Sequence, residues 1–119
     1  QSNADSAVLW KKSAQVHFYL NFYEETIEGC KNAIDLGNND TETWTLWMDA
    51  FLLASEWNKA IEIGEEALEF HEKKSSIMYR LAGCKFRLGK VDEAQIIFDQ
   101  IKEEFKVPKD INHLFPELI

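Results

Sequence analysis

A similar pattern of apolar residues recurs every 34 residues along this chain. Within each period these residues are spaced by three and four, which places their side chains on one face of a helix. The recurring sets are Trp10, Trp44 and Met78; Tyr23, Trp57 and Val91; Ile27 and Ile61; and Ala33, Ala67 and Ile101. A fixed period of this length predicts helical hairpins that stack on one another to bury a continuous core.

The period divides the 119 residues into five segments. A short leader resembles the remnant of a cleaved affinity tag, and three repeats follow it. The last segment is a short amphipathic cap, which Pro116 interrupts and which we expect to pack on the last hairpin. The segments are residues 1–4, 5–40, 41–74, 75–108 and 109–119. Because a helical pattern begins almost at once and without an initiator methionine, we expect a piece of a longer protein.

Each repeat is predicted to hold two helices, so the predicted fold class is all-α. Gly37 and Gly89 suit the left-handed residue that ends a helix. The polar run Asn38-Asn39-Asp40 suits the N-cap of the helix that follows it. The predicted helices span residues 7–20, 24–36, 41–54, 58–71, 75–88 and 92–105.

Composition excludes two classes of partner. The net charge is −8 and the pI is near 4.8, so the chain repels a phosphate backbone and we expect no nucleic-acid ligand. No apolar run approaches the roughly 18 to 20 residues that cross a bilayer, so we expect no membrane insertion. The 45% of hydrophobic residues is sufficient for a continuous core.

No pattern of catalytic or metal-binding residues is present in the sequence. Cys30 and Cys84 lie within helical patterns without a CxxC pair, so we expect small buried core residues with free thiols. His17, His71 and His113 are far apart, and none has a second His or Cys at helical ligand spacing. The chain has neither a glycine-rich phosphate loop nor a nucleophile elbow. We therefore expect no enzyme activity, no metal and no cofactor.

These residues resemble the tetratricopeptide repeat, whose unit carries Trp, Leu, Gly and Tyr on its first helix and Ala, a large residue and Ala on its second. The resemblance covers residues 7–108. The middle repeat matches at Trp44, Trp47, Met48, Phe51, Trp57, Ala60, Ala67 and Leu68. The third repeat matches at Leu81, Ala82, Gly89, Ala94 and Phe98, but it has Lys85 where the family has an aromatic residue. The first repeat keeps Trp10, Ala14, Tyr23, Ala33 and Ile34, but it departs from the family pattern at Ser13 and Thr26. The proline that usually closes a unit is missing after the first two repeats.

The resemblance implies a right-handed superhelix that binds a peptide or helix of a partner protein in its concave groove. By that resemblance the first helix of each repeat lines the groove, which would have an aromatic and aliphatic floor suited to apolar anchors. The residues at these places are Val8, Lys11, Gln15, Phe18 and Tyr19; Glu42, Thr45, Asp49, Leu52 and Leu53; and Ser76, Tyr79, Gly83, Phe86 and Arg87. The alternative is that Phe18, Leu52 and Phe86 only pack against neighbouring helices.

One branch of the family uses Lys, Arg and Asn residues to clamp the acidic C-terminal tail of chaperones. Only Lys11 and Arg80 fit that pattern, whereas Gln15, Leu46 and Ser76 replace the other residues that it needs. The sequence therefore disfavours this ligand.

Three functional hypotheses remain open at this stage. The first is an interaction scaffold that binds a protein or peptide partner in the groove. The second is a structural module that self-associates, through the tail at residues 115–119 or through the edge of the first repeat. The third is the C-terminal regulatory arm of a larger multidomain protein, such as an enzyme or a transcription regulator.

Overall fold

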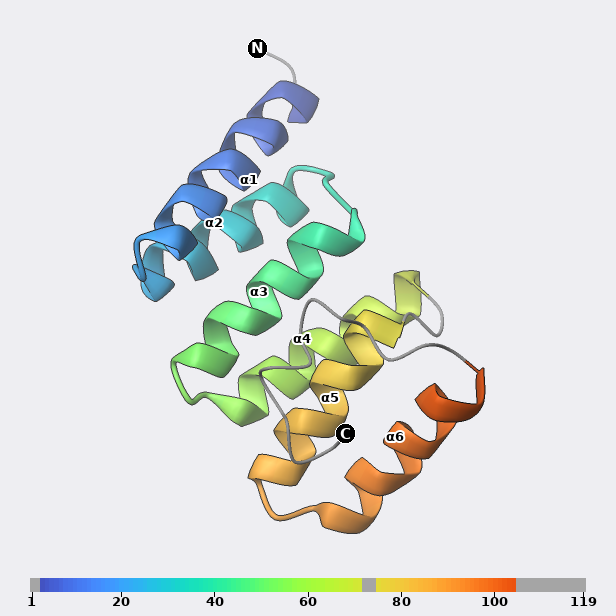
Figure 1. Cartoon of the computed structure of the whole chain (residues 1–119). Coiled ribbons are helices and arrows are strands. Elements are labelled where there is room, and N and C mark those ends of the chain that lie inside the picture. Colours follow the sequence, from blue (N-terminus) through green and yellow to red (C-terminus); the bar gives the residue numbers. More distant parts are fainter. Residues whose placement is uncertain (1–2, 72–74, 105–119) are drawn as a thin grey trace. The chain divides into compact units, whose positions relative to one another are not determined.

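The computed structural model describes residues 3–71 and 75–104, which form six α-helices and no strand (Figure 1). The helices are α1 (Asn3–Tyr19), α2 (Tyr23–Asp35), α3 (Thr41–Leu53), α4 (Trp57–Phe70), α5 (Ser75–Arg87) and α6 (Val91–Glu104). Their bounds lie within one residue of the predicted ones, except that α1 begins at Asn3, earlier than expected. The prediction of an all-α array of paired helices is confirmed. The predicted cap, residues 109–119, lies outside the described residues.

The chain divides into two compact units, Gln1–Glu56 and Trp57–Ile119, called here the N-terminal and the C-terminal unit. In the N-terminal unit α2 contacts both α1 and α3, and α1 also contacts α3. The core of this unit combines small and large side chains, because Ala14 and Ala33 are fully buried together with Trp44 and Met48.

A glycine allows α1 and α2 to approach closely. A Cβ added at Gly29 would lie 2.9 Å from the Cβ of Ala14 and 3.2 Å from the backbone oxygen of Trp10. Real Cβ atoms do not come so close to other atoms, so an alanine here would push the two helices apart. Gly29 therefore sets the distance between α1 and α2.

Two tryptophans of α3 differ in how their indole N–H is satisfied. Trp44 is 1% exposed, and its Nε1 donates a 2.8 Å hydrogen bond to Oδ1 of Asn39. The ring of Trp47 lies 5.7 Å from that of Trp44 and 6.4 Å from that of Phe51, between centroids. Its Nε1 is buried without a hydrogen-bond partner among the described residues. The sequence alone does not distinguish these two tryptophans.

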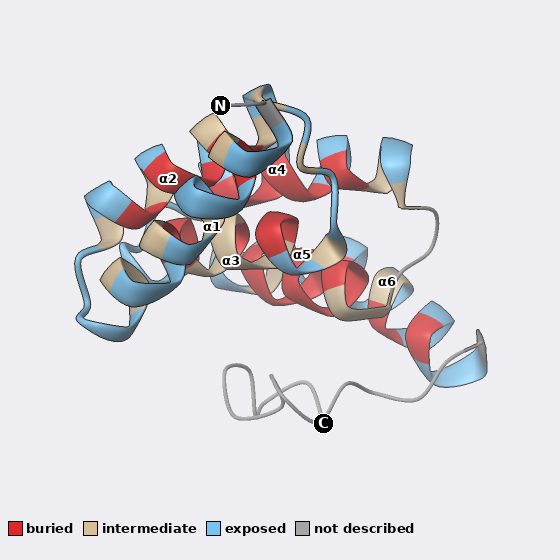
Figure 2. Ribbon diagram, turned by 90° about the horizontal axis from the view of Figure 1, so that it is seen from above, coloured by how far each residue is buried: buried red, intermediate tan, exposed pale blue. Residues whose placement is uncertain are grey.

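In the C-terminal unit α5 contacts both α4 and α6. Residues 77–84 of α5 are all buried, as the red ribbon of this helix shows (Figure 2). The ring of Tyr79 meets the ring of Phe98 edge-on at 6.0 Å between centroids, a favoured geometry for aromatic pairs. Ala94 and Ile101 of α6 are also fully buried. The hydrophobic core of this unit is therefore centred on α5.

The turns that follow α1, α3 and α5 have one geometry, repeated at the 34-residue period. Asn21, Ser55 and Gly89 have positive φ angles of 65°, 60° and 82°. After each of them, a backbone N–H donates to the carbonyl five residues earlier, as in Phe22 to His17. This is the Schellman arrangement that ends a helix with a left-handed residue. Gly37, at φ 107°, ends α2 in the same way, which confirms both glycine caps predicted from the sequence.

Candidate functional site

The predicted groove residues of the first two repeats lie on α1 and α3, which contact each other within the N-terminal unit. They are Val8, Lys11, Gln15, Phe18 and Tyr19 on α1 and Glu42, Thr45, Asp49, Leu52 and Leu53 on α3. The remaining ones lie on α5 in the C-terminal unit and are Ser76, Tyr79, Gly83, Phe86 and Arg87. That these residues contact a ligand stays a prediction, but the structure shows which of their side chains are exposed.

On α1 and α3, Tyr19 and Leu53 offer apolar surface to a partner. They occupy the same position of consecutive repeats and are 86% and 43% exposed. Phe18 is half-buried, with its ring 6.1 Å from that of Tyr23 between centroids. Leu52 is only 4% exposed and belongs to the core, which is the packing role that the sequence left open for it.

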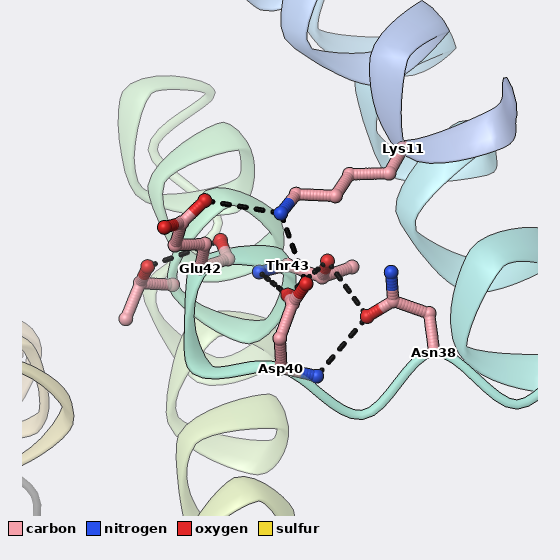
Figure 3. A network of polar contacts seen from close by, with 6 residues as sticks. Lys11, Asn38, Asp40, Glu42 and Thr43 are labelled. Atoms are coloured by element: carbon pink, nitrogen blue, oxygen red, sulfur yellow. Dashed lines mark hydrogen bonds and ion pairs between the residues drawn. The ribbon is translucent and has the colours of Figure 1, made fainter. Parts of the chain in front are cut away.

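Lys11 is held by two carboxylates at the start of α3 (Figure 3). Its Nζ donates to Oδ2 of Asp40 at 2.9 Å and to Oε2 of Glu42 at 3.0 Å. The Lys11 side chain is 19% exposed, whereas those of Asp40 and Glu42 are 46% and 77% exposed. This ion-pair group links α1 directly to α3. The sequence did not predict these ion pairs. The signal present in it was an acidic N-cap, Asp40, followed by an acidic residue in the first turn, Glu42.

Asp40 is held in place by the turn that it caps. It accepts a 2.8 Å hydrogen bond from the backbone N–H of Thr43, as an N-cap residue does, and another from the Thr43 hydroxyl. Asn38 Oδ1 in turn accepts from the backbone N–H of Asp40 at 3.0 Å, and it lies 3.0 Å from the Thr43 hydroxyl oxygen, whose single proton it shares with the Asp40 carboxylate. The Asn38-Asn39-Asp40 loop therefore positions the carboxylate that binds Lys11, and the N-cap prediction is confirmed.

The pKa values of this group reflect its hydrogen bonds. Partial burial raises the pKa of Asp40, but the bonds from Thr43 and Lys11 outweigh it, so the pKa lies below its ordinary value. The hydrogen bond to Asp40 raises the pKa of Lys11, and Glu42 adds to this increase against the opposing effect of burial. The formal charges of Lys11, Asp40 and Glu42 sum to one net negative charge.

In the C-terminal unit the groove positions of α5 are less accessible. Tyr79 is fully buried and Phe86 is half-buried, whereas Arg87 is exposed. The other basic residue singled out in the sequence, Arg80, is 4% exposed, and its guanidinium donates to the backbone oxygen of Ser76 at 3.0 Å. At least one hydrogen-bond donor of Arg80 is therefore satisfied by the backbone of its own helix.

The described residues show no site for a metal or a reactive thiol. No group of three or more His, Cys, Asp or Glu side chains among them is arranged to hold a metal ion. Cys30 and Cys84 are free and buried, as predicted. Burial raises the pKa of the Cys30 thiol to about 12, with smaller contributions from Asp49 and Asp40, so this thiol stays protonated and unreactive. Among the described helices, none is both long and apolar enough to span a bilayer.

Comparisons with known proteins agree with this geometry. The family model described as Tetratricopeptide repeat matches residues 51–111, just over half of the chain. The first such domain of Spaghetti (RPAP3), solved with the HSP90 peptide SRMEEVD, superposes with a TM-score of 0.83 at 15% identity, over 98% of this chain and 93% of its own. The corresponding domain of Arabidopsis OM64 gives 0.79 at 16% identity, over 99% and 100%. No curated protein sequence matches the chain.

Proposed function

The chain belongs to the tetratricopeptide repeat family, and from that premise we propose that it is a protein-interaction module. It binds an extended or helical segment of a partner protein along the α1 and α3 surface. The observation that carries the proposal is the exposure of Tyr19 and Leu53 at equivalent positions of two helices that contact each other. Tyrosine is among the side chains enriched in binding hot spots, and Leu53 adds exposed apolar surface on the helix that contacts α1.

The proposed partner segment is neutral or basic and carries apolar anchors. Lys11, Asp40 and Glu42 leave one net negative charge beside the surface, and the chain as a whole carries −8. An acidic segment would have to compete with Asp40 and Glu42 for Lys11 while being repelled by the rest of the chain. This distinguishes the proposed ligand from the acidic HSP90 peptide in the Spaghetti domain, and it agrees with the replacement of clamp residues at Gln15, Leu46 and Ser76.

The proposal includes no catalytic step and no cofactor. It rests on the lack of any phosphate loop, nucleophile elbow or ordered catalytic triad in the sequence. An acidic chain also lacks the basic surface that nucleic-acid binding requires. A binding role alone is therefore proposed for these 119 residues.

The proposal can be tested with a displayed library of random 16-residue peptides, selected on the immobilised protein. We expect the selected peptides to be rich in aliphatic, aromatic and basic residues. A Tyr19→Glu/Leu53→Glu variant should bind them at least tenfold more weakly, because two apolar contacts are replaced by charges. The matched control is Ile96→Glu, which changes another exposed apolar residue, on α6.

Both variants change exposed side chains, so circular dichroism should show unchanged folding. Selection of peptides that end in acidic residues would overturn the proposed ligand chemistry. Equal loss of binding in the Ile96→Glu control would show that the contact does not lie on α1 and α3.

A further inference from the structure

The ion pairs of Lys11 lie on the same surface as Tyr19 and Leu53. Lys11, Gln15 and Tyr19 follow one another at intervals of four residues, so they share one face of α1. Glu42 and Leu53 are eleven residues apart, about three turns of α3, so they also share a face. The Lys11 ammonium reaches Glu42 across the contact between the two helices. The ion pairs therefore form one end of the α1 and α3 surface, and the exposed apolar side chains form the other.

The two ends are close enough for one bound segment to reach both. Eight positions separate Lys11 from Tyr19 along α1, which corresponds to a rise of about 12 Å. An extended chain covers this distance in about four residues. A segment with an apolar side chain on Tyr19 therefore brings the side chains about three to five positions away to the Lys11 end.

Two carboxylates of the chain itself already hold the Lys11 ammonium, as Figure 3 shows. Asp40 accepts from it at 2.9 Å and Glu42 at 3.0 Å. Lys11 is the least exposed of the three side chains and Glu42 the most exposed. A ligand that approaches this end therefore meets carboxylate oxygens ahead of the ammonium. An acidic side chain of a ligand has to displace one of them before it can bind Lys11.

Asp40 is the more firmly held of the two carboxylates. Its Oδ1 accepts from the backbone N–H of Thr43, so the cap fixes the side chain independently of Lys11. The bond to Asp40 is also the largest of the effects that raise the pKa of Lys11, ahead of the bond to Glu42. A carboxylate that is fixed in place binds the ammonium without the loss of freedom that a ligand group undergoes. It therefore competes well with an acidic ligand.

We propose that Asp40 and Glu42 are specificity-determining residues, which exclude acidic partner segments from the α1 and α3 surface by occupying Lys11. The inference rests on the proposed function, because it concerns the charge of the segment bound at that surface. It assigns the exclusion to two carboxylates, where the overall charge of −8 would act from the whole chain. Without these carboxylates, the same surface binds an acidic side chain about three to five residues from the apolar anchor.

The variant Asp40→Asn/Glu42→Gln removes both carboxylates with little change of shape. Asparagine caps a helix as well as aspartate does, so its Oδ1 keeps the bond from the Thr43 N–H. Its amide nitrogen then replaces Oδ2, and this nitrogen is a donor that cannot accept from Lys11. The matched control is Asp35→Asn/Glu28→Gln, which removes two exposed carboxylates of α2 and changes the net charge equally.

The test repeats the peptide-library selection of the proposed function on the unchanged protein, the variant and the control. We expect Asp and Glu to be at least about threefold more frequent in the peptides selected on Asp40→Asn/Glu42→Gln than in the other two sets. The most enriched acidic peptide, made synthetically, should bind the unchanged protein about tenfold more weakly than the variant. Adding Lys11→Met to the variant should remove this gain, because the ammonium is then missing.

The two carboxylates should also differ in their separate effects. Asp40→Asn alone should increase the affinity for the acidic peptide more than Glu42→Gln alone, because Asp40 is the firmer partner of Lys11. Circular dichroism verifies that each variant is folded. Glu42→Gln leaves the cap side chain unchanged, so it keeps the test decisive even where Asp40→Asn weakens the helix start.

The outcomes separate this inference from the proposed function. An equal content of Asp and Glu in the peptides selected on unchanged and variant protein would overturn the inference, and the proposed function would stand if both sets still needed Tyr19 and Leu53. Equal enrichment in the control, or a gain that survives Lys11→Met, would also overturn it. Peptide binding that survives Tyr19→Glu/Leu53→Glu would instead overturn the proposed function, and the inference with it.

Discussion

Helices α1 and α5 hold the same place in the first and third repeats, yet they differ sharply in burial. Residues 77–84 of α5 are all buried, whereas Ala7 and Ala14 are the buried residues among the described side chains of α1 (Figure 2). Both helices are followed by a second helix that packs on them, but only α5 also has a helix before it within its unit. The difference shows that neighbours in the array, more than a helix's own sequence, decide how much of it is buried.

The largest expected effect comes from truncating one equivalent residue on each helix. Ile77 is fully buried, so Ile77→Ala should lower the free energy of unfolding by about 2–5 kcal/mol through lost burial and a new cavity. Leu9, at the same repeat position, is 55% exposed, so Leu9→Ala should change it by less than about 0.5 kcal/mol. Urea unfolding of both variants measures the difference. Similar costs for the two would show that α1 is covered as fully as α5.

The second prediction tests how closely α1 packs against α2. Gly29→Ala brings a Cβ to within 2.9 Å of the Cβ of Ala14, so we expect a cost of about 1–3 kcal/mol as α1 and α2 move apart. Glu28→Ala, at an exposed position of the same helix, is the matched control and should be nearly neutral. Hydrogen exchange should show faster opening of α1 in the Gly29 variant, with the amides of α5 unchanged. Equal exchange along α1 in both variants would contradict this account.

The repeat period was sufficient to predict most of the fold. Three-and-four spacing placed all six helices, and Gly37 and Gly89 marked two of the helix ends. The left-handed Ser55 was less visible, because a serine has no intrinsic preference for that conformation and is placed there by the geometry of the hairpin. Asn21 adopts it more readily, since asparagine is enriched at positive φ, but it is a weaker signal than a glycine. The 34-residue spacing from Gly89 was the signal that could have revealed them.

The candidate site was harder to predict, because exposure depends on neighbouring helices. Leu52 and Leu53 are adjacent leucines, yet one is 4% and the other 43% exposed. Tyr79 occupies a groove position but is fully buried. The partners of Lys11 depend on contacts across about thirty residues of sequence, from α1 to the start of α3. Helical periodicity specifies a face, and tertiary packing decides which part of that face stays open.

The turns that end α1 and α5 allow a finer comparison. Gly89→Ala should cost about 1–2 kcal/mol, because an alanine at φ 82° suffers the strain of the left-handed region. Asn21, at φ 65°, already tolerates that region, so Asn21→Gly should change stability by only a few tenths of a kcal/mol. Thermal unfolding followed by circular dichroism would measure both. A large gain from Asn21→Gly would show that the turn after α1 is strained where the turn after α5 is not.

The smallest expected effect concerns the ion pairs that link α1 to the start of α3. Lys11→Met should lower the free energy of unfolding by about 0.2–1 kcal/mol at pH 7, since Asp40 and Glu42 are largely exposed. The control is Lys31→Met, which breaks a 2.7 Å pair with Asp35 that is exposed on both sides and should have the smaller effect.

The pH dependence of the Lys11→Met effect has a definite sign. The pKa of Asp40 is lowered in the folded protein, so its contribution is complete above the ordinary value of about 3.9 and is lost as the pH falls through the lower folded value. The pKa of Lys11 is raised, so its contribution is complete below about 10.4 and is lost only as the pH rises through the raised value. The difference between unchanged and variant protein should therefore be constant between these limits and shrink in acid. Because the variant removes one of the bonds that lower it, the carboxyl pKa of Asp40, followed by ¹³C NMR, should rise. An unchanged Asp40 titration would show that Lys11 does not stabilise the carboxylate, and the attachment of α1 to α3 would then depend on packing alone.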